Sequence, residues 1–298
     1  MKSERKTAAR ARPILAVLST LIFLALSSST AFAEKSDTGA KAFEDLDRKN
    51  FDRSSNIDNK WLPLRPGHRS VLTGYTGEGK KRVPHRVVMT VTDLTKVIDG
   101  VRAVVVWDLD YRSGKMVESE LVFFAQDNLG NVWHMGQYRE TYEDGEFVGG
   151  QAWLSGLEGA RAGIMMKAEP QLNTPSYSEG FAPAPYNWTD RGKVDQISPK
   201  VCVPQGCHEQ VLVIAEFSKE EGPDAQQLKY YAPSLGNIRV RWRGKGERTQ
   251  EVLDLVEVAK LGPEEMAKVR AEALALEKRA YTYGRTPPAE PMQLAKEQ

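Results

Sequence analysis

The sequence predicts a mainly β protein, namely a curved antiparallel sheet or half-barrel of roughly eight to eleven strands with one C-terminal α-helix. Three observations lead to this fold class. Runs of alternating apolar and polar residues recur between residues 69 and 258, turn residues separate these runs, and residues 263–281 have the apolar spacing of an amphipathic helix. The composition, with 41 Lys and Arg against 40 Asp and Glu and 41% hydrophobic residues, is typical of a globular protein and argues against intrinsic disorder.

The first 33 residues have the three parts of a secretory signal peptide. Basic residues gather between positions 2 and 12, apolar residues fill positions 14–26, and Ala31-Phe32-Ala33 forms a small-residue cleavage site. A transmembrane anchor is the alternative, but about 13 apolar residues are fewer than the roughly 20 that cross a bilayer. We therefore expect cleavage after Ala33, export to the periplasm or the extracellular space, and a protein that is not integral to the membrane.

The mature chain is expected to hold one folded domain with flexible ends. Residues 34–56 are polar, so we expect a flexible lead-in with at most one helical turn. Residues 57–281 form the β-rich domain, and residues 282–298 form a disordered tail. Without residues 1–33 the chain carries 36 basic and 39 acidic side chains, and this small acidic excess argues against a nucleic-acid partner.

Hairpin turns organise the first half of the domain. Asp99-Gly100 lies between two alternating runs, and Asp-Gly at such a place favours a two-residue hairpin turn. Ser113-Gly114, residues 128–131 and Asp144-Gly145 separate the runs that follow. These turns predict an antiparallel meander that continues to residue 154, with one buried face and one partly solvated face.

The second half contains a loop region, further strands and the helix. Residues 155–200 are rich in Pro, Gly, Ser and Asn, and their aromatic side chains either contact a ligand as a lid or cap one end of the core. Strands are expected at residues 210–217, 228–232, 238–242 and 252–258. Pro263 at the first helical position and the two acidic residues after it predict a helix over 263–281 that docks on the sheet.

The two cysteines are expected to form a local disulfide. Cys202 and Cys207 lie in a chain exported to an oxidising compartment, and Pro204 and Gly206 favour a turn that brings the two thiols together. With His208 the segment is also a stretched form of the haem attachment motif. Its spacing is not the C-x-x-C of that motif or of a thioredoxin-like redox site. The sequence therefore indicates no haem and no other cofactor.

No arrangement of residues in the sequence indicates a metal site or a catalytic nucleophile. The four histidines lack close ligand spacing, and the Asp and Asn residues near 108–114 and 127–131 lack the full calcium-loop pattern. The common nucleophile and phosphate-binding motifs are absent as well. Acidic residues are numerous between positions 118 and 146, but the sequence does not show which of them face each other. We therefore favour a non-enzymatic protein, with a hydrolase that uses acidic residues as an alternative.

Three arginines alternate along one predicted strand. Arg239, Arg241 and Arg243 project from the same face, because side chains two residues apart lie on one side of a strand. Such a row is able to hold an anionic head group or a membrane surface. We favour pairing with the acidic residues at positions 251, 254 and 257 of the next strand.

Two sequence motifs resemble a known group of proteins. Residues 56–67, NIDNKWLPLRPG, and residues 229–236, KYYAPSLG, are similar to motifs of a family of secreted, β-rich bacterial proteins whose function is uncharacterised. The resemblance covers roughly residues 51–258 and implies a bacterial source. The second motif also resembles the closing strands of half-barrel periplasmic carriers of lipoproteins and lipids, which implies a lipid-carrying role by fold-level analogy. The family implies no catalytic residues.

The sequence favours an exported protein that binds an apolar or amphipathic, lipid-like ligand or an envelope component. A curved sheet should line such a site with large apolar side chains, and the candidates are Trp107, Phe123, Trp133 and Trp153. The helix or the loop of residues 155–200 would then close the cavity. The alternative class is a structural or interaction protein of the cell envelope, and an interior filled with side chains would favour it.

Overall fold

The computed structural model describes residues 37, 39–77, 81–218, 224–247 and 250–292, apart from the side chains of residues 198 and 199. The predicted signal peptide, residues 1–33, and its cleavage site lie outside the described residues. Within the described part of the chain, no helix combines the length and the apolar character that a membrane crossing requires.

One antiparallel sheet and one C-terminal helix account for the described fold, which confirms the predicted fold class. The fifteen strands of the described residues follow the order β8-β10-β11-β12-β13-β14-β1-β2-β3-β4-β5-β7-β9, with β6 paired to β5 and β15 paired to β2. The elements are η1 (Arg48–Asn50), β1 (His68–Thr76), β2 (Val83–Ile98), β3 (Val101–Arg112), β4 (Lys115–Gln126), β5 (Val132–Glu143), β6 (Glu146–Leu154), β7 (Arg161–Met166), β8 (Tyr177–Ser178), β9 (Gly180–Phe181), β10 (Arg191–Val203), β11 (Gly206–Phe217), β12 (Gln226–Ala232), β13 (Gly236–Arg243), β14 (Val252–Lys260), α1 (Pro263–Arg279) and β15 (Glu290–Pro291). The strands exceed the predicted number because residues 155–200 and the C-terminal tail contribute several more.

The predicted hairpin turns shape the meander from β2 to β6. Asp99 and Gly100 have φ angles of 49° and 79°, and the register pairs Ile98 with Val101 around them. Positive φ at both central residues gives a two-residue turn the twist of its flanking strands, and glycine adopts such angles without strain. The hairpin predicted at Asp99-Gly100 is therefore confirmed.

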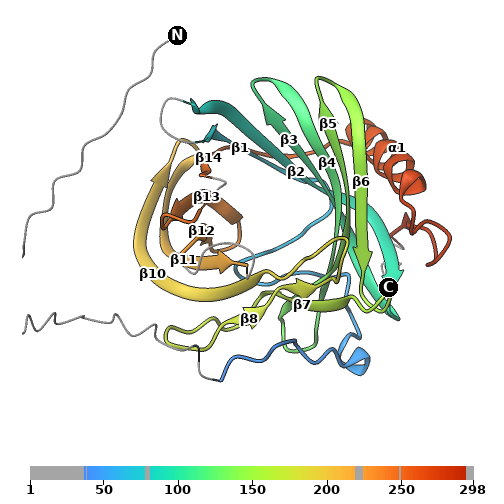
Figure 1. Cartoon of the computed structure of the whole chain (residues 1–298), viewed down its shortest axis with the longest axis horizontal. Coiled ribbons are helices and arrows are strands. Elements are labelled where there is room, and N and C mark those ends of the chain that lie inside the picture. The colour runs from blue at the N-terminus through green and yellow to red at the C-terminus, as the bar shows by residue number, and fades with distance from the viewer. Residues whose placement is uncertain (1–36, 38, 78–80, 219–223, 248–249, 293–298) are drawn as a thin grey trace, which may run out of the picture. The chain divides into compact units, whose positions relative to one another are not determined.

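The two ends of the strand order meet in one short segment. β8 pairs with β10 and β9 pairs with β7, and Glu179 alone separates β8 from β9 in the sequence. A Cβ atom on Gly163 of β7 would lie 2.1 Å from the Gly180 nitrogen, so this close approach requires glycine. The sheet is therefore curved, and residues 177–181 pair with a strand near each of its two ends. Strands β10–β14 face strands β1–β5 across an interior (Figure 1). Part of the predicted loop region is therefore an element of the sheet.

Alternation along the strands divides the core in two. Val105 of β3 and Phe123 of β4 pack with helix residues such as Leu276. Val106 and Phe124, which are the next residues along the same strands, pack with the cluster inside the curve of the sheet. Each of the two strands therefore contributes one face to the helix-covered core and the other face to the interior.

α1 packs on β2 and β4 from outside the curve (Figure 1). Its buried apolar residues run from Met266 to Leu276 at helical spacing, so the predicted docking on the sheet is confirmed. The helix ends at Arg279, two residues before the predicted end. A buried ion pair, with 2.7 Å between Lys96 Nζ and Glu277 Oε1, links β2 to the helix.

Described residues at both ends of the domain contact the sheet. In the predicted lead-in, Glu44 accepts a hydrogen bond from the Ser178 nitrogen at 3.1 Å, and Arg48 Nε donates one to the Asp99 carbonyl oxygen at 2.7 Å. In the predicted tail, β15 pairs with β2. Polar side chains of residues 34–56 thus bond to the sheet, and residues 282–298 add a short strand to it.

The disulfide expected from the sequence joins Cys202 and Cys207 in the hairpin between β10 and β11. The two cysteines are register partners, and Val203 pairs with Gly206 next to the turn. The bridge therefore links neighbouring strands within one hairpin.

Candidate functional site

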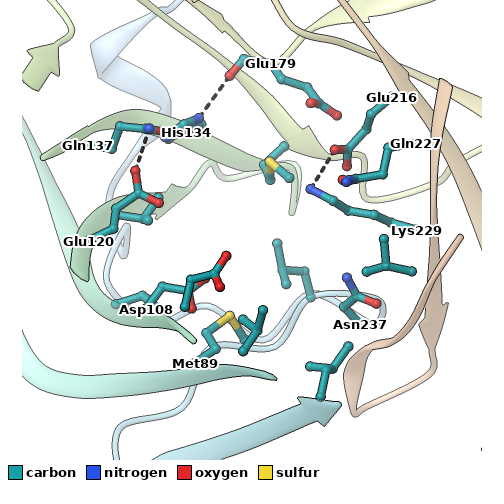
Figure 2. Close-up of a pocket in the computed structure, with 18 of the residues that line it drawn as sticks. Met89, Asp108, Glu120, His134, Gln137, Glu179, Glu216, Gln227, Lys229 and Asn237 are labelled. Atoms are coloured by element: carbon teal, nitrogen blue, oxygen red, sulfur yellow. Dashed lines mark hydrogen bonds and ion pairs between the residues drawn. The ribbon is translucent and has the colours of Figure 1, made fainter. Parts of the chain in front are cut away.

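A cavity of about 390 Å³ lies inside the curve of the sheet. Its wall takes side chains from β1 to β5 on one side, from β11 to β14 on the other, and from the region between β7 and β10. Figure 2 shows Asp108 and Glu120 on one side of the cavity and Glu216 and Lys229 on the other. The cavity is therefore walled by strands that are far apart in the sequence.

The wall changes from apolar to acidic along β3 and β4. The register pairs, in order, Val106 with Val122, Asp108 with Glu120, and Asp110 with Glu118. All six side chains line the cavity. Because residues two apart on a strand are separated by about 6.6 to 6.8 Å, the apolar and the acidic parts of the wall adjoin.

The acidic part of the wall, formed by these four carboxyl groups, disfavours its own ionisation, because like charges directly opposite each other on a sheet repel. Burial, together with the charges of Asp110 and Glu118, raises the pKa of Asp108 to about 7. Burial also raises the pKa of Glu120 to about 8, against the opposing charge of Arg139. Carboxyl groups with such perturbed pKa values are more frequent at functional sites than elsewhere.

Two basic side chains line the cavity, and each contacts an acid. Lys229 Nζ lies 2.6 Å from Glu216 Oε2. Burial lowers the pKa of Lys229, but the charge of Glu216 and its neighbours outweighs burial and raises this pKa overall. Arg139 Nη1 lies 3.8 Å from Glu118 Oε2. The described bases of the wall are thus engaged with acids of the same wall.

Four acceptor atoms in the wall have no hydrogen-bond partner among the described residues. They are Asp108 Oδ1, Glu179 Oε1, Glu216 Oε1 and His134 Nε2. His134 Nδ1 donates a hydrogen bond to the Glu179 carbonyl oxygen at 3.2 Å, which leaves Nε2 of the neutral ring as an acceptor. Burial lowers the pKa of His134 to about 3, so the ring is neutral in the physiological range. Trp188 Nε1, a donor in the same wall, also has no partner among the described residues, so four acceptor atoms stand against one donor.

His85 lies beside the acidic wall, between two carboxyl groups. Its Nε2 is 2.8 Å from Asp110 Oδ1, and its Nδ1 is 3.7 Å from Glu251 Oε1. In the described part of the chain, these three side chains form a group close enough to hold a metal ion, with ligand atoms within 4.8 Å of one another. Burial lowers the pKa of His85, but the hydrogen bond and charge of Asp110 outweigh burial and raise it. A protonated His85 that bridges both carboxylates accounts for this geometry without a metal ion.

Three of the four aromatic residues expected to line a ligand site lie on the opposite face of the sheet. Trp107, Phe123 and Trp133 pack in the core beneath α1. Trp153 lines a separate cavity of about 100 Å³, and its ring stacks on Trp188. The first three side chains fill the space under the helix, whereas the cavity is lined by a different set that includes Phe124, Trp188 and Tyr231. The structure therefore assigns the larger cavity to the face without these aromatics.

The row of arginines on β13 is paired with acids. Arg239 Nε and Arg241 Nη2 donate hydrogen bonds to Asp254 of β14 at 2.6 and 2.9 Å. Arg243 Nη2 donates one to Asp195 of β10 at 2.6 Å. The first two pairs follow the expectation from the sequence, and the third reaches a different strand.

The acidic wall is the feature that sequence analysis did not identify. Its signal in the sequence is a pair of acidic residues at alternate positions on each of two consecutive strands, Asp108-x-Asp110 and Glu118-x-Glu120. Alternation places each pair on one face of its own strand. Whether the two pairs share a face depends on the register between the strands.

Comparison with known proteins gives two structures of similar fold. One is a protein from Bacteroides fragilis NCTC 9343 that is predicted to be exported and has a YmcC-like fold, with 14% identity and a TM-score of 0.42. The other is a predicted lipoprotein from Parabacteroides distasonis ATCC 8503, with 13% identity and a TM-score of 0.36. Each alignment covers 68% of this chain and 100% of the other chain. No family model matches the chain, and no curated protein matches it significantly. Likeness at this level says nothing about the function of this chain.

Proposed function

We propose that the chain is an exported, non-enzymatic protein that binds an amphipathic ligand in the larger cavity. The observation that carries the proposal is the wall itself, which is apolar at Val106 and Val122 and acidic one step further along the same strands. The volume of about 390 Å³ lies within the range of small-ligand sites, about 300–1,000 Å³. A ligand with an alkyl chain and a polar end matches both parts of the wall.

The packing of the molecule supports a carrier over a purely structural protein. A structural envelope protein would fill its interior with side chains at the density of an ordinary core. The core beneath α1 has this character, with Phe123 and Leu276 each 2% exposed. The interior of the curve instead retains a cavity, which a ligand would occupy. The signal-peptide pattern and the disulfide support export.

The proposal is tested by filling the apolar part of the cavity. Val122→Trp places a large ring where the alkyl chain would lie, whereas Val258→Trp makes the same exchange at an exposed position of β14. We expect the wild type and V258W to carry a lipid-like molecule in native mass spectra and to bind the neutral probe N-phenyl-1-naphthylamine. V122W should lose both, while its circular dichroism spectrum remains that of a folded β protein. A wild type that binds neither, or a V122W that binds both, contradicts the proposal.

A hydrolase that uses acidic residues is the second candidate, and the pair Asp108 and Glu120 favours it. Carboxyl groups with pKa values of about 7 and about 8 retain protons near neutral pH, as a general acid must. Turnover of chromogenic glycosides or esters that Asp108→Asn and Glu120→Gln each abolish would establish this activity. Glu272→Gln, on the exposed side of α1, is the control that should leave turnover unchanged.

A further inference from the structure

The charges of the cavity wall are strongly unbalanced. Among its described residues, eight are acidic and two are basic. The two bases are Lys229, which pairs with Glu216 at 2.6 Å, and Arg139, which lies 3.8 Å from Glu118. These contacts leave an excess of acidic groups in the wall.

In the described part of the chain, neither Asp108 nor Glu120 forms an ion pair, although Arg139 is the register partner of Glu120 and its charge opposes the burial that raises the pKa of that group. Glu120 Oε1 accepts a hydrogen bond from Gln137 Nε2 at 2.6 Å, and this donor is neutral. Asp108 Oδ1 is buried and has no partner among the described residues. His85 of β2 bonds to Asp110 instead. The pair therefore combines two carboxyl groups that have no ion-pair partner in the described chain with an unfilled acceptor.

Two further unpaired atoms of the cavity wall give a second, independent indication of the missing group. Glu179 is 1% exposed and His134 is 2% exposed, and both line the cavity. Glu179 Oε1 and His134 Nε2 have no partner among the described residues, and Trp188 Nε1 is the one donor of the described wall in the same state. Buried acceptors without a donor are rare in folded proteins, so a ligand that brings donors would complete this wall.

We infer that the polar end of the ligand is a protonated amine and that the carboxyl groups of Asp108 and Glu120 are its seat. The inference rests on the proposed function of the cavity. An alkylammonium group brings three N–H donors and one positive charge, which match acceptors and negative charge. A carboxylate or phosphate end would instead place acceptors and negative charge against the same wall.

The position of this seat fits an amine attached directly to an alkyl chain. Val106 and Val122 precede Asp108 and Glu120 by one step of two residues along β3 and β4. This step is about 6.6 to 6.8 Å, a distance that a few methylene groups span. The alkyl chain therefore reaches the apolar wall as soon as the ammonium group is seated.

The test compares three probes with the same chain and different ends: decylamine, 1-decanol and decanoate, each below its micelle concentration. Isothermal titration calorimetry with the purified protein near neutral pH should show decylamine binding at least about tenfold more tightly than 1-decanol, because charge-assisted hydrogen bonds contribute more than neutral ones. Decanoate should bind most weakly. The variant D108N/E120Q should remove the preference for decylamine and leave 1-decanol unchanged. The control D144N/E272Q removes one Asp and one Glu charge at exposed positions and should keep the preference.

Every other outcome contradicts the amine seat, and one of them also contradicts the proposed function. If 1-decanol or decanoate binds as tightly as decylamine, the amine seat is wrong while ligand binding stands. If no probe binds, both the seat and the proposed function are wrong. A preference for decylamine that survives in a folded D108N/E120Q also overturns the seat, and the single variant Glu120→Gln repeats the comparison if the double variant does not fold. Calcium binding that D108N/E120Q abolishes, without a preference for decylamine, assigns the acids to a metal ion and overturns the inference.

Discussion

The two faces of strands β3 and β4 differ in whether their side chains find favourable partners within the chain. On the face beneath α1, Val105, Leu121 and Phe123 are at most 2% exposed and pack against apolar helix residues. On the cavity face, Asp108 and Glu120 are register partners, and burial raises the pKa of both carboxyl groups because their charged forms are disfavoured there. The first face stabilises the fold and the second destabilises it. Groups that a fold retains against its own stability are characteristic of functional sites, so this difference supports the proposed ligand site on the cavity face.

The same comparison shows what large aromatic residues indicate in this protein. Phe123 and Trp133 have their partners within the chain, in the core under the helix. Val122, on the other face of β4, borders open space. Large aromatic residues do not distinguish the two faces, because Phe124 of the same strand lines the cavity. A face that binds a ligand has to be recognised from groups that lack partners.

The largest expected effect is a difference in stability loss when one side chain on each face is truncated to alanine. Phe123→Ala should lower the free energy of unfolding by about 3 to 5 kcal/mol, because it leaves a cavity in a close-packed core. Val122→Ala removes side-chain atoms that already border a cavity, so it should cost about 1 kcal/mol or less. Urea unfolding followed by circular dichroism measures both losses. Equal losses would show that the interior is packed as tightly as the helix-covered core.

The next effect concerns a stabilising feature outside the cavity wall. Cys202→Ser/Cys207→Ser should lower the free energy of unfolding by about 2 kcal/mol, because the bridge closes a short loop and removes little entropy from the unfolded chain. The double variant should still fold and should bind N-phenyl-1-naphthylamine as the wild type does. Loss of folding, or loss of probe binding in a folded variant, would show that the hairpin affects more than local stability.

The sequence predicts the fold class because the information is local. Asp99-Gly100 fixes a turn, and the alternating residues on both sides define two strands without any knowledge of the rest of the chain. The bridge at residues 177–181 is different. Its two strands contain two residues each, too few to show alternation, and they depend on a close approach to Gly163 from another strand. Such contacts have no local signal.

The acidic wall could not be predicted because a β-bulge determines it. The turn pairs Arg112 with Lys115. An uninterrupted ladder from that pair would place Asp108 opposite Ser119, with Glu118 and Glu120 on the other face of the sheet. The register shift between Asp110 and Tyr111 moves the pairing by one residue, so Asp108 pairs with Glu120. One extra residue in β4 therefore brings four carboxyl groups to one face.

The acidic wall should destabilise the protein as the pH rises. Burial raises the pKa of Asp108 to about 7 and of Glu120 to about 8, so the folded state keeps protons that the unfolded chain releases near pH 4. The free energy of unfolding must then fall as the pH rises from about 4 to 8. D108N/E120Q removes this loss and should be more stable than the wild type near pH 8.5 by at least about 1.4 kcal/mol, the value of one pKa unit.

Urea unfolding of both proteins at about pH 5 and 8.5 checks this expectation. The gain should be small at the lower pH, where the wild-type carboxyl groups are already protonated in the folded state. D144N/E272Q should show no gain at either pH, because its two carboxyl groups are exposed. A D108N/E120Q variant that is less stable than the wild type at the higher pH would mean that the charged pair has a partner within the folded chain.

The smallest expected effect concerns His85. Its substitution tests whether a protonated imidazole ring stabilises the protein by bridging two carboxylates. The hydrogen bond and charge of Asp110, with the charge of Glu251, outweigh burial and hold the pKa of His85 above its ordinary value of 6.5. A raised pKa on a base contributes stability that is fully present below 6.5 and is lost as the pH rises through the folded-state value. His85→Asn should therefore lose more stability near pH 5.5 than near pH 8.5, by about 1 kcal/mol.

The His85 variant also separates two origins of pH dependence that act in the same direction. The acids of the cavity wall and His85 both make the wild type less stable at high pH. The acids do so because they become negatively charged and repel one another. His85 does so because it loses the positive charge with which it bridges two carboxylates. D108N/E120Q should be more stable than the wild type at high pH, whereas His85→Asn should be less stable at low pH. Urea midpoints of the wild type and the two variants across this range measure both differences. Equal losses for His85→Asn at both pH values would mean that His85 is neutral in the folded protein, and Asp110 and Glu251 would then lack a cation between them.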